Sequence, residues 1–292
     1  MKRFLLSTAA TALLLTPLAC DFGTTGNQLL AKKVMVGTLF STPDVDVSAS
    51  AMAGLDAGTL PDGGIREGER ITIPGQTAAF VFFASRESEQ GTPEPIANAT
   101  VRIEAVNGGQ FNLEGKGAGT YSHTSDFGDD AGVKYKSGAT YRFIAVQDGT
   151  SHVGTVEQAP ALERIETLHP AGGYVRHTAS QSLTLQRPAP AGGGERTLGF
   201  VTVFPLANDG EKGEPTYTNM PKEPLDFLQI VLAQGEWKAA TMTIPGSAFP
   251  QAKSNYLVVF QTVKTGGPES DNLFVGSALL VGTADVGMVH TQ

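Results

Sequence analysis

The sequence has one cysteine, one tryptophan and no cluster of basic residues among its 292 positions, and each scarcity excludes a class of protein. Cys20 stands alone, so no disulfide can form within the chain. Lysine and arginine total 21 against 29 acidic residues, which gives a net charge of −8 at pH 7. Because nucleic acids and anionic lipid surfaces both require a basic patch, we expect no nucleic-acid partner.

Familiar catalytic motifs are also missing from the sequence. No two of the five histidines have a spacing that would bring both imidazoles to one metal ion on a strand face. They are His123, His152, His169, His177 and His290. The sequence has no Gly-x-Ser-x-Gly elbow and no glycine-rich phosphate loop before a helix. We therefore expect a non-catalytic protein, with an enzyme whose residues converge from separate loops as the third alternative.

The most apolar stretch lies at the start of the chain. Two basic residues within residues 1–3 precede an apolar run over residues 4–15, which is too short to span a bilayer comfortably. This layout, ending at Cys20, resembles the export signal of bacterial lipoproteins. The resemblance implies that residues 1–19 are removed and that Cys20 is acylated as the mature N-terminus. Pro17 stands where that family usually has leucine, and an ordinary signal peptide with a coincidental cysteine is the alternative.

The lipoprotein resemblance implies a location in the bacterial cell envelope. Acyl chains would anchor the protein to a membrane, either on the outer membrane or facing the periplasm. Asp21 resembles an inner-membrane retention signal of enterobacteria, so that location stays open. Residues 20–33 contain glycine, threonine and asparagine and predict a tether. Removing residues 1–19 from the 292 leaves 273, with 19 basic and 29 acidic side chains and a charge of −10.

Apolar and polar residues alternate with the period of β-strands through the rest of the chain, as in residues 140–146. The 35 glycines and 17 prolines interrupt almost every gap, and no stretch of a dozen residues has a clear helical face. The sequence predicts an all-β fold. The expected strands of the first half are 34–40, 71–73, 78–84, 99–106, 110–113, 120–124, 140–146 and 151–156. Those of the second half are 162–168, 182–186, 199–204, 227–232, 237–244, 256–263 and 274–281.

A domain boundary is predicted near residues 158–162, which separates a first domain, 34–158, from a second, 162–292. In each domain a tyrosine, Tyr141 or Tyr256, stands at the head of an alternating strand behind a short turn. Both resemble the tyrosine corner of Greek-key sandwiches, in which the ring packs at the core edge and the hydroxyl bonds back to the preceding connection. The first domain resembles immunoglobulin-like modules and the second resembles fibronectin type III modules. The resemblance implies two antiparallel Greek-key β-sandwiches.

Three carboxylates gather in one predicted turn, at Asp126, Asp129 and Asp130. With backbone carbonyls they would suit a hard cation, so calcium is the candidate cofactor of this loop. The alternative is a solvated turn that uses aspartate for its turn propensity.

Aromatic residues supply the other candidate site. Trp237, the sole tryptophan, would stack on a sugar ring if it faced outward, and its alternative is a place in the core. Tyr217 lies in a predicted long loop, residues 206–225, and would add to an aromatic contact surface. Two more long loops are expected at 42–70 and 86–95.

The sequence thus favours a membrane-anchored structural or protein-interaction module whose partner is another envelope protein. A carbohydrate- or calcium-binding module that contacts a surface glycan is the alternative.

Overall fold

The computed structural model describes residues 22–42, 45–48, 70–73, 76–87, 92–124, 135–190, 194–206, 212–221 and 235–292. These residues are mostly β-strand with one short helix, α1 (Phe22–Leu30), which confirms the all-β prediction. Helix α1 falls within the predicted tether. In the described part of the chain, no helix has the length and apolar character needed to cross a membrane.

The strands of the first half are β1 (Lys33–Thr42), β2 (Val45–Ser48), β3 (Arg70–Ile73), β4 (Gln76–Ser85), β5 (Glu94–Pro95), β6 (Thr100–Ala105), β7 (Gln110–Gly117), β8 (Thr120–Thr124), β9 (Tyr141–Gln147) and β10 (Thr150–Val156). Those of the second half are β11 (Val175–His177), β12 (Leu183–Gln186), β13 (Leu198–Leu206), β14 (Tyr217–Thr218), β15 (Thr241–Ile244), β16 (Asn255–Pro268) and β17 (Ala278–Thr291). Short 3-10 helices are η1 (Glu166–Leu168), η4 (Glu236–Lys238) and η5 (Gly246–Ala248).

Most strands of the first half form, together with β16 and β17, a closed ring of pairings around one core, while β2 and β3 form a separate pair and β5 pairs only with β4. From β17 the pairings run through β1, β4, β8, β7, β6, β9 and β10 to β16, which pairs back with β17. Strand β1 is parallel to β17 and antiparallel to β4. The enclosed core combines Phe83 and Phe143 with Leu279 and Val281, the last two from β17. The last strand of the chain therefore completes the core of the first half.

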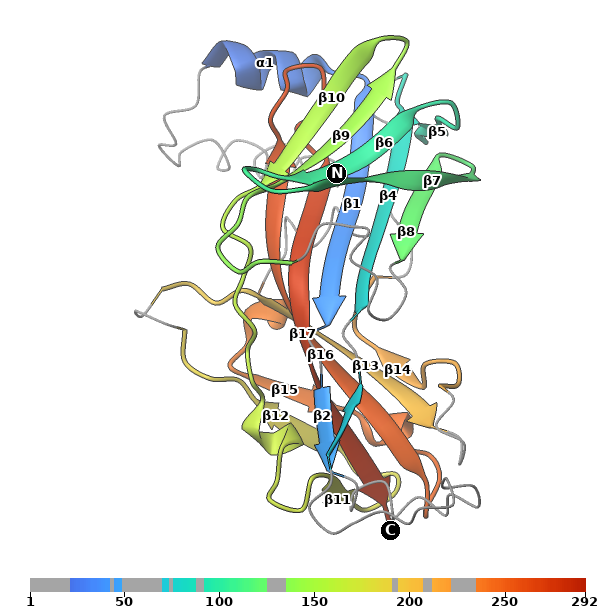
Figure 1. Cartoon of the computed structure of the whole chain (residues 1–292), viewed down its shortest axis with the longest axis vertical. Coiled ribbons are helices and arrows are strands. Elements are labelled where there is room, and N and C mark those ends of the chain that lie inside the picture. Colours follow the sequence, from blue (N-terminus) through green and yellow to red (C-terminus); the bar gives the residue numbers. More distant parts are fainter. Residues whose placement is uncertain are drawn as a thin grey trace, which may run out of the picture.

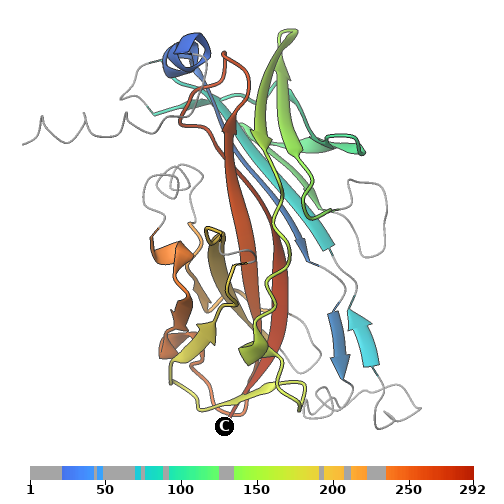
Figure 2. The same cartoon turned by 90° about the vertical axis from the view of Figure 1, so that its left-hand side faces the viewer.

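Strands β16 and β17 are long enough to pass through both halves of the molecule (Figure 1). In the second half they are flanked by β13 and β14 on one side and by β11 on the other, and the pair β12–β15 forms a separate small sheet. The second core lies between these layers and includes Leu185, Val203, Ile244 and Phe260. Figure 2 shows the small sheet packed to one side of the long strands.

Strand β17 is buried along most of its length because both of its faces are covered. Leu279 and Val281 point into the first core, while Ala278 and Leu280 point into a third apolar cluster with Phe200 on the opposite face. Strands β12 and β15 instead alternate buried and exposed residues, as expected for strands with one solvated face.

Three of the predicted strands are wrong over part or all of their length. The predicted strand 274–281 is strand only from Ala278, where β17 begins. Residues 162–168 form no strand; Ile165 is buried, and its N–H donates to the Asp285 side chain at 2.7 Å instead of to a neighbouring strand. Residues 237–244 begin in η4 and become a strand only at β15. The predicted strand 227–232 lies outside the described residues. Short strands β5, β11 and β14 were too brief to show a period in the sequence.

Candidate functional site

A surface cavity of about 330 Å³ opens in the second half between β14, η4 and β15. Its lining is mixed and combines apolar side chains with hydroxyl, amide and carboxylate groups. The lining residues are Val201, Tyr217, Asn219, Glu236, Ala239, Thr241, Met242, Thr243 and Ile244. Met242 and Ile244 belong to the second core, so this part of the lining is fixed by core packing.

Tyr217 reaches this cavity because β14 pairs with β13, where Tyr217 lies opposite Val203. Its ring is half-buried against the second core. Burial raises the pKa of the Tyr217 hydroxyl, and the negative charge of Glu236 raises it further. The hydroxyl is therefore neutral at physiological pH and can both donate and accept a hydrogen bond.

Asn219 holds the other wall of the cavity in place. Its side-chain oxygen accepts from the Val201 N–H at 2.7 Å, and its backbone N–H donates to the Val201 carbonyl at 3.2 Å. Its carbonyl accepts from the Trp237 indole N–H at 3.3 Å. These three bonds fix the chain after β14 against both β13 and η4.

Trp237 does not line the cavity. Its ring is half-buried and packs against the third apolar cluster, with its centroid 6.2 Å from that of Phe200. Tyr217 packs instead against the second core, so the structure does not bring the two predicted aromatic residues into one stacking surface. Glu236, the neighbour of Trp237, is the residue of η4 that reaches the cavity.

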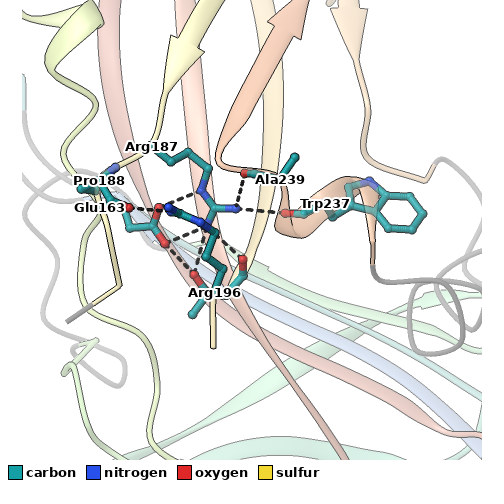
Figure 3. Close-up of polar contacts among 7 residues, drawn as sticks. Glu163, Arg187, Pro188, Arg196, Trp237 and Ala239 are labelled. Carbon is teal, nitrogen blue, oxygen red and sulfur yellow. Dashed lines mark hydrogen bonds and ion pairs between the residues drawn. The ribbon is translucent and has the colours of Figure 1, made fainter. Parts of the chain in front are cut away.

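Behind η4 lies a fully buried arginine, Arg187, whose side chain is 0% exposed (Figure 3). It makes two hydrogen bonds to the Glu163 carboxylate, at 2.9 and 2.7 Å. Further bonds reach the carbonyls of Trp237 at 3.0 Å and Thr197 at 2.9 Å. A further bond reaches the Thr197 hydroxyl at 3.2 Å. Because these partners lie on separate segments, the network positions η4 and the segment before β12. No sequence pattern indicates this network, because a single arginine directly after an alternating strand is typical of an exposed strand end.

A second buried pair joins His169 to Asp285 on β17. The His169 Nε2 lies 2.8 and 2.9 Å from the two carboxylate oxygens of Asp285. The same carboxylate accepts from the Ile165 N–H, and the pair thus fastens the segment between the two halves to β17.

The two tyrosines predicted as corners are both fully buried. The Tyr141 hydroxyl accepts from the Lys136 N–H at 2.8 Å, and the Tyr256 hydroxyl accepts from the Gln251 N–H at 3.1 Å. Tyr121 makes the same kind of bond, because its hydroxyl accepts from the Ala99 N–H at 3.0 Å. Its hydroxyl donates to the Ile96 carbonyl at 2.7 Å.

The remaining predicted residues, Cys20, Asp126, Asp129 and Asp130, lie outside the described residues. Among the residues that are described, no group of three or more His, Cys, Asp or Glu side chains is arranged to hold a metal ion. The calcium prediction therefore stays a prediction from the sequence.

Comparisons with protein-family models and with curated proteins gave no match.

Proposed function

We propose that this protein is a non-catalytic, lipid-anchored lipoprotein of the bacterial cell envelope that acts as a structural or protein-interaction module. The observation that carries the proposal is the position of the sole cysteine, Cys20, directly behind a basic start and a short apolar run. Acyl chains on that residue would hold the protein at a membrane surface.

The architecture is suited to presenting loops at a distance from such an anchor. Helix α1 follows Cys20 closely and lies at one end of the elongated body, and the C-terminus lies near the other (Figure 1). Strands β16 and β17 pair over twelve positions along this body and give it a continuous hydrogen-bonded spine. Bending that spine would break backbone bonds in both halves, so the module is built as one stiff unit.

We assign the two halves to immunoglobulin-like and fibronectin type III-like Greek-key sandwiches. The support is local: the hydroxyls of Tyr141 and Tyr256 each bond to a backbone N–H five residues upstream, ahead of a core strand. The layered second core supports the same assignment.

Fractionation of cells tests the anchoring. The native chain is expected in the membrane fraction and a Cys20→Ala variant outside it. Protease added to intact cells then separates a surface-exposed protein, which is digested, from one that faces the periplasm, which is protected. A native chain that never enters the membrane fraction would contradict the proposal.

A second candidate function is the binding of a neutral sugar in the cavity beside Tyr217. The observation that favours it is the lining itself, in which a neutral tyrosine hydroxyl, an amide and two threonine hydroxyls accompany apolar side chains. Titration with a panel of neutral mono- and disaccharides, followed by NMR, tests it. A sugar that binds should lose affinity in Tyr217→Phe and keep it in Tyr174→Phe, a matched change outside the cavity. Equal affinities in the two variants, or no binding, would remove this function.

A further inference from the structure

The last turn of helix α1 is fixed to the body of the protein by hydrogen bonds. The Gln28 carbonyl accepts from the Val275 N–H at 3.1 Å, and its side-chain amide donates to the carbonyls of Pro268 and Ser270. Gln28 itself is only 8% exposed. These hydrogen bonds hold one face of the helix against the loop between β16 and β17.

Arg86 holds the helix from the other direction. Its guanidinium donates to the carbonyls of Leu29 at 2.9 Å and Ala31 at 3.2 Å, which caps the C-terminal end of the helix with a cation. The same guanidinium lies 3.4 Å from the centroid of the Phe274 ring. With these contacts on both sides, the orientation of the last helical turn is set by the fold.

Despite these contacts, three large apolar side chains in this region face solvent. Leu30 is 80% exposed, Leu29 is 52% exposed and Val275 is 38% exposed. We call these three residues the α1 patch. Single exposed apolar residues are ordinary on protein surfaces, but here three come from two segments joined by the Gln28–Val275 bond. Exposed apolar side chains on segments that are held in place favour contact with an apolar partner.

The position of the patch along the chain identifies that partner. Helix α1 begins at Phe22, two residues after Cys20, and two extended residues span roughly 7 Å. An acylated Cys20 would therefore keep α1 at the bilayer surface. We propose that the α1 patch lies in the boundary between lipid headgroups and acyl chains, beside the lipid anchor. This inference rests on the proposed lipid anchoring and adds an orientation to it.

The charges around the patch point to an apolar contact with the bilayer, without a need for anionic lipid. The exposed Lys32 and the Arg86 guanidinium at the helix end are matched in number by the exposed carboxylates Glu87 and Asp271, so these four residues carry no net charge. The acylated Cys20 and the α1 patch would be two adjoining points of attachment. They would direct the long axis of the protein away from the membrane and place the C-terminal end farthest from it (Figure 2).

Site-directed spin labelling of the lipidated chain tests the proposal. Acylation occupies Cys20, so an introduced cysteine is the only free thiol. The test variant is Leu30→Cys, and the matched control is Ala252→Cys, an exposed position whose neighbour Lys253 bonds to Thr291 at the C-terminal end. Both substitutions are at exposed positions and should leave the fold intact. The probe is a vesicle of phosphatidylcholine, and the readout is collision of the label with oxygen against collision with a water-soluble nickel chelate.

At position 30 oxygen collisions should exceed nickel collisions several-fold, and at position 252 the order should be reversed. The depth at position 30 should be unchanged in 1 M salt and with added anionic lipid. A protein that binds the vesicles while the label at position 30 is as accessible to nickel as the one at position 252 would overturn the inference and leave the anchoring intact. If the label at position 30 leaves the bilayer in 1 M salt, so that nickel collisions exceed oxygen collisions, an apolar contact is refuted as well. A chain that stays out of the vesicles would overturn the proposed function together with the inference.

Discussion

Replacement of the buried arginine by methionine, Arg187→Met, is the change to which this fold should be most sensitive. The side chain is 0% exposed and its partner Glu163 is 18% exposed, so the substitution leaves a mostly desolvated carboxylate and two backbone carbonyls without their donor. Removing one partner of a buried ion pair costs about 3–5 kcal/mol. For a chain of this size each kcal/mol lowers the melting temperature by about 2–4 °C, so we expect a decrease of about 6–20 °C.

The assays are thermal unfolding, which gives the melting temperature, and urea unfolding, which gives the free energy. Both are followed by the fluorescence of Trp237, which is the sole tryptophan and whose carbonyl accepts from Arg187. The matched control is Arg142→Met, which removes an arginine that also pairs with a glutamate but whose side chain is 39% exposed. An exposed pair of this kind contributes about 0–1 kcal/mol.

A companion double variant separates lost charge pairing from lost packing. Arg187→Met combined with Glu163→Leu removes both charges and should recover a large part of the loss, because the desolvated carboxylate is gone and only the carbonyls of Trp237 and Thr197 remain without their donor. If Arg187→Met costs no more than Arg142→Met, the reasoning that the buried network holds η4 in place is refuted.

Three further changes test separate parts of the fold. In Gly287→Ala the added carbon would lie 2.5 Å from the Leu168 Cβ, so we expect lower stability and faster proteolysis of the segment between the two halves; an unchanged digestion rate would contradict that packing. Tyr141→Phe leaves the Lys136 N–H without its acceptor and should cost about 1–3 kcal/mol in urea unfolding, and a loss below 0.5 kcal/mol would show that water replaces the hydroxyl. Burial lowers the pKa of His152, so near pH 6.5 the unfolded chain binds a proton more readily than the folded chain does. The free energy of unfolding should therefore decrease as pH falls through 6.5. In melting curves between pH 7.5 and 5.5, the melting temperature of His152→Gln should decrease less steeply than that of the native chain.

The parts of the structure that the sequence predicted are those set by local patterns. Period-two alternation and frequent glycine and proline indicated an all-β chain, and most predicted strands correspond to observed ones within a few residues. The place of Tyr141 and Tyr256 ahead of their strands is also a local pattern, and each hydroxyl bond spans only five residues.

The parts that the sequence did not reveal depend on contacts between distant segments. Nothing near β1 shows that Val36 pairs in parallel with Ala278, so the shared spine of the two halves was not predictable from alternation. Gly266 is another residue whose role depends on a distant segment. A Cβ there would lie 2.0 Å from the Thr155 carbonyl oxygen, and this position requires glycine only because β10 pairs with β16.

The candidate site divides in the same way. Tyr217 was singled out because it is an aromatic residue in a long loop, and it does line the cavity. Glu236 and Asn219 were not singled out, because their role comes from the way η4 and the end of β14 meet in space. Trp237 turned inward because its indole N–H finds an acceptor at the Asn219 carbonyl and its ring an apolar cluster.

Mass spectrometry of the N-terminal peptide from membranes of cells producing the native chain tests the central claim most directly. If the protein is a lipoprotein, the peptide begins at Cys20 and carries the mass of acyl chains on that residue. A peptide that begins elsewhere, or a Cys20 with an unmodified thiol, would contradict that claim.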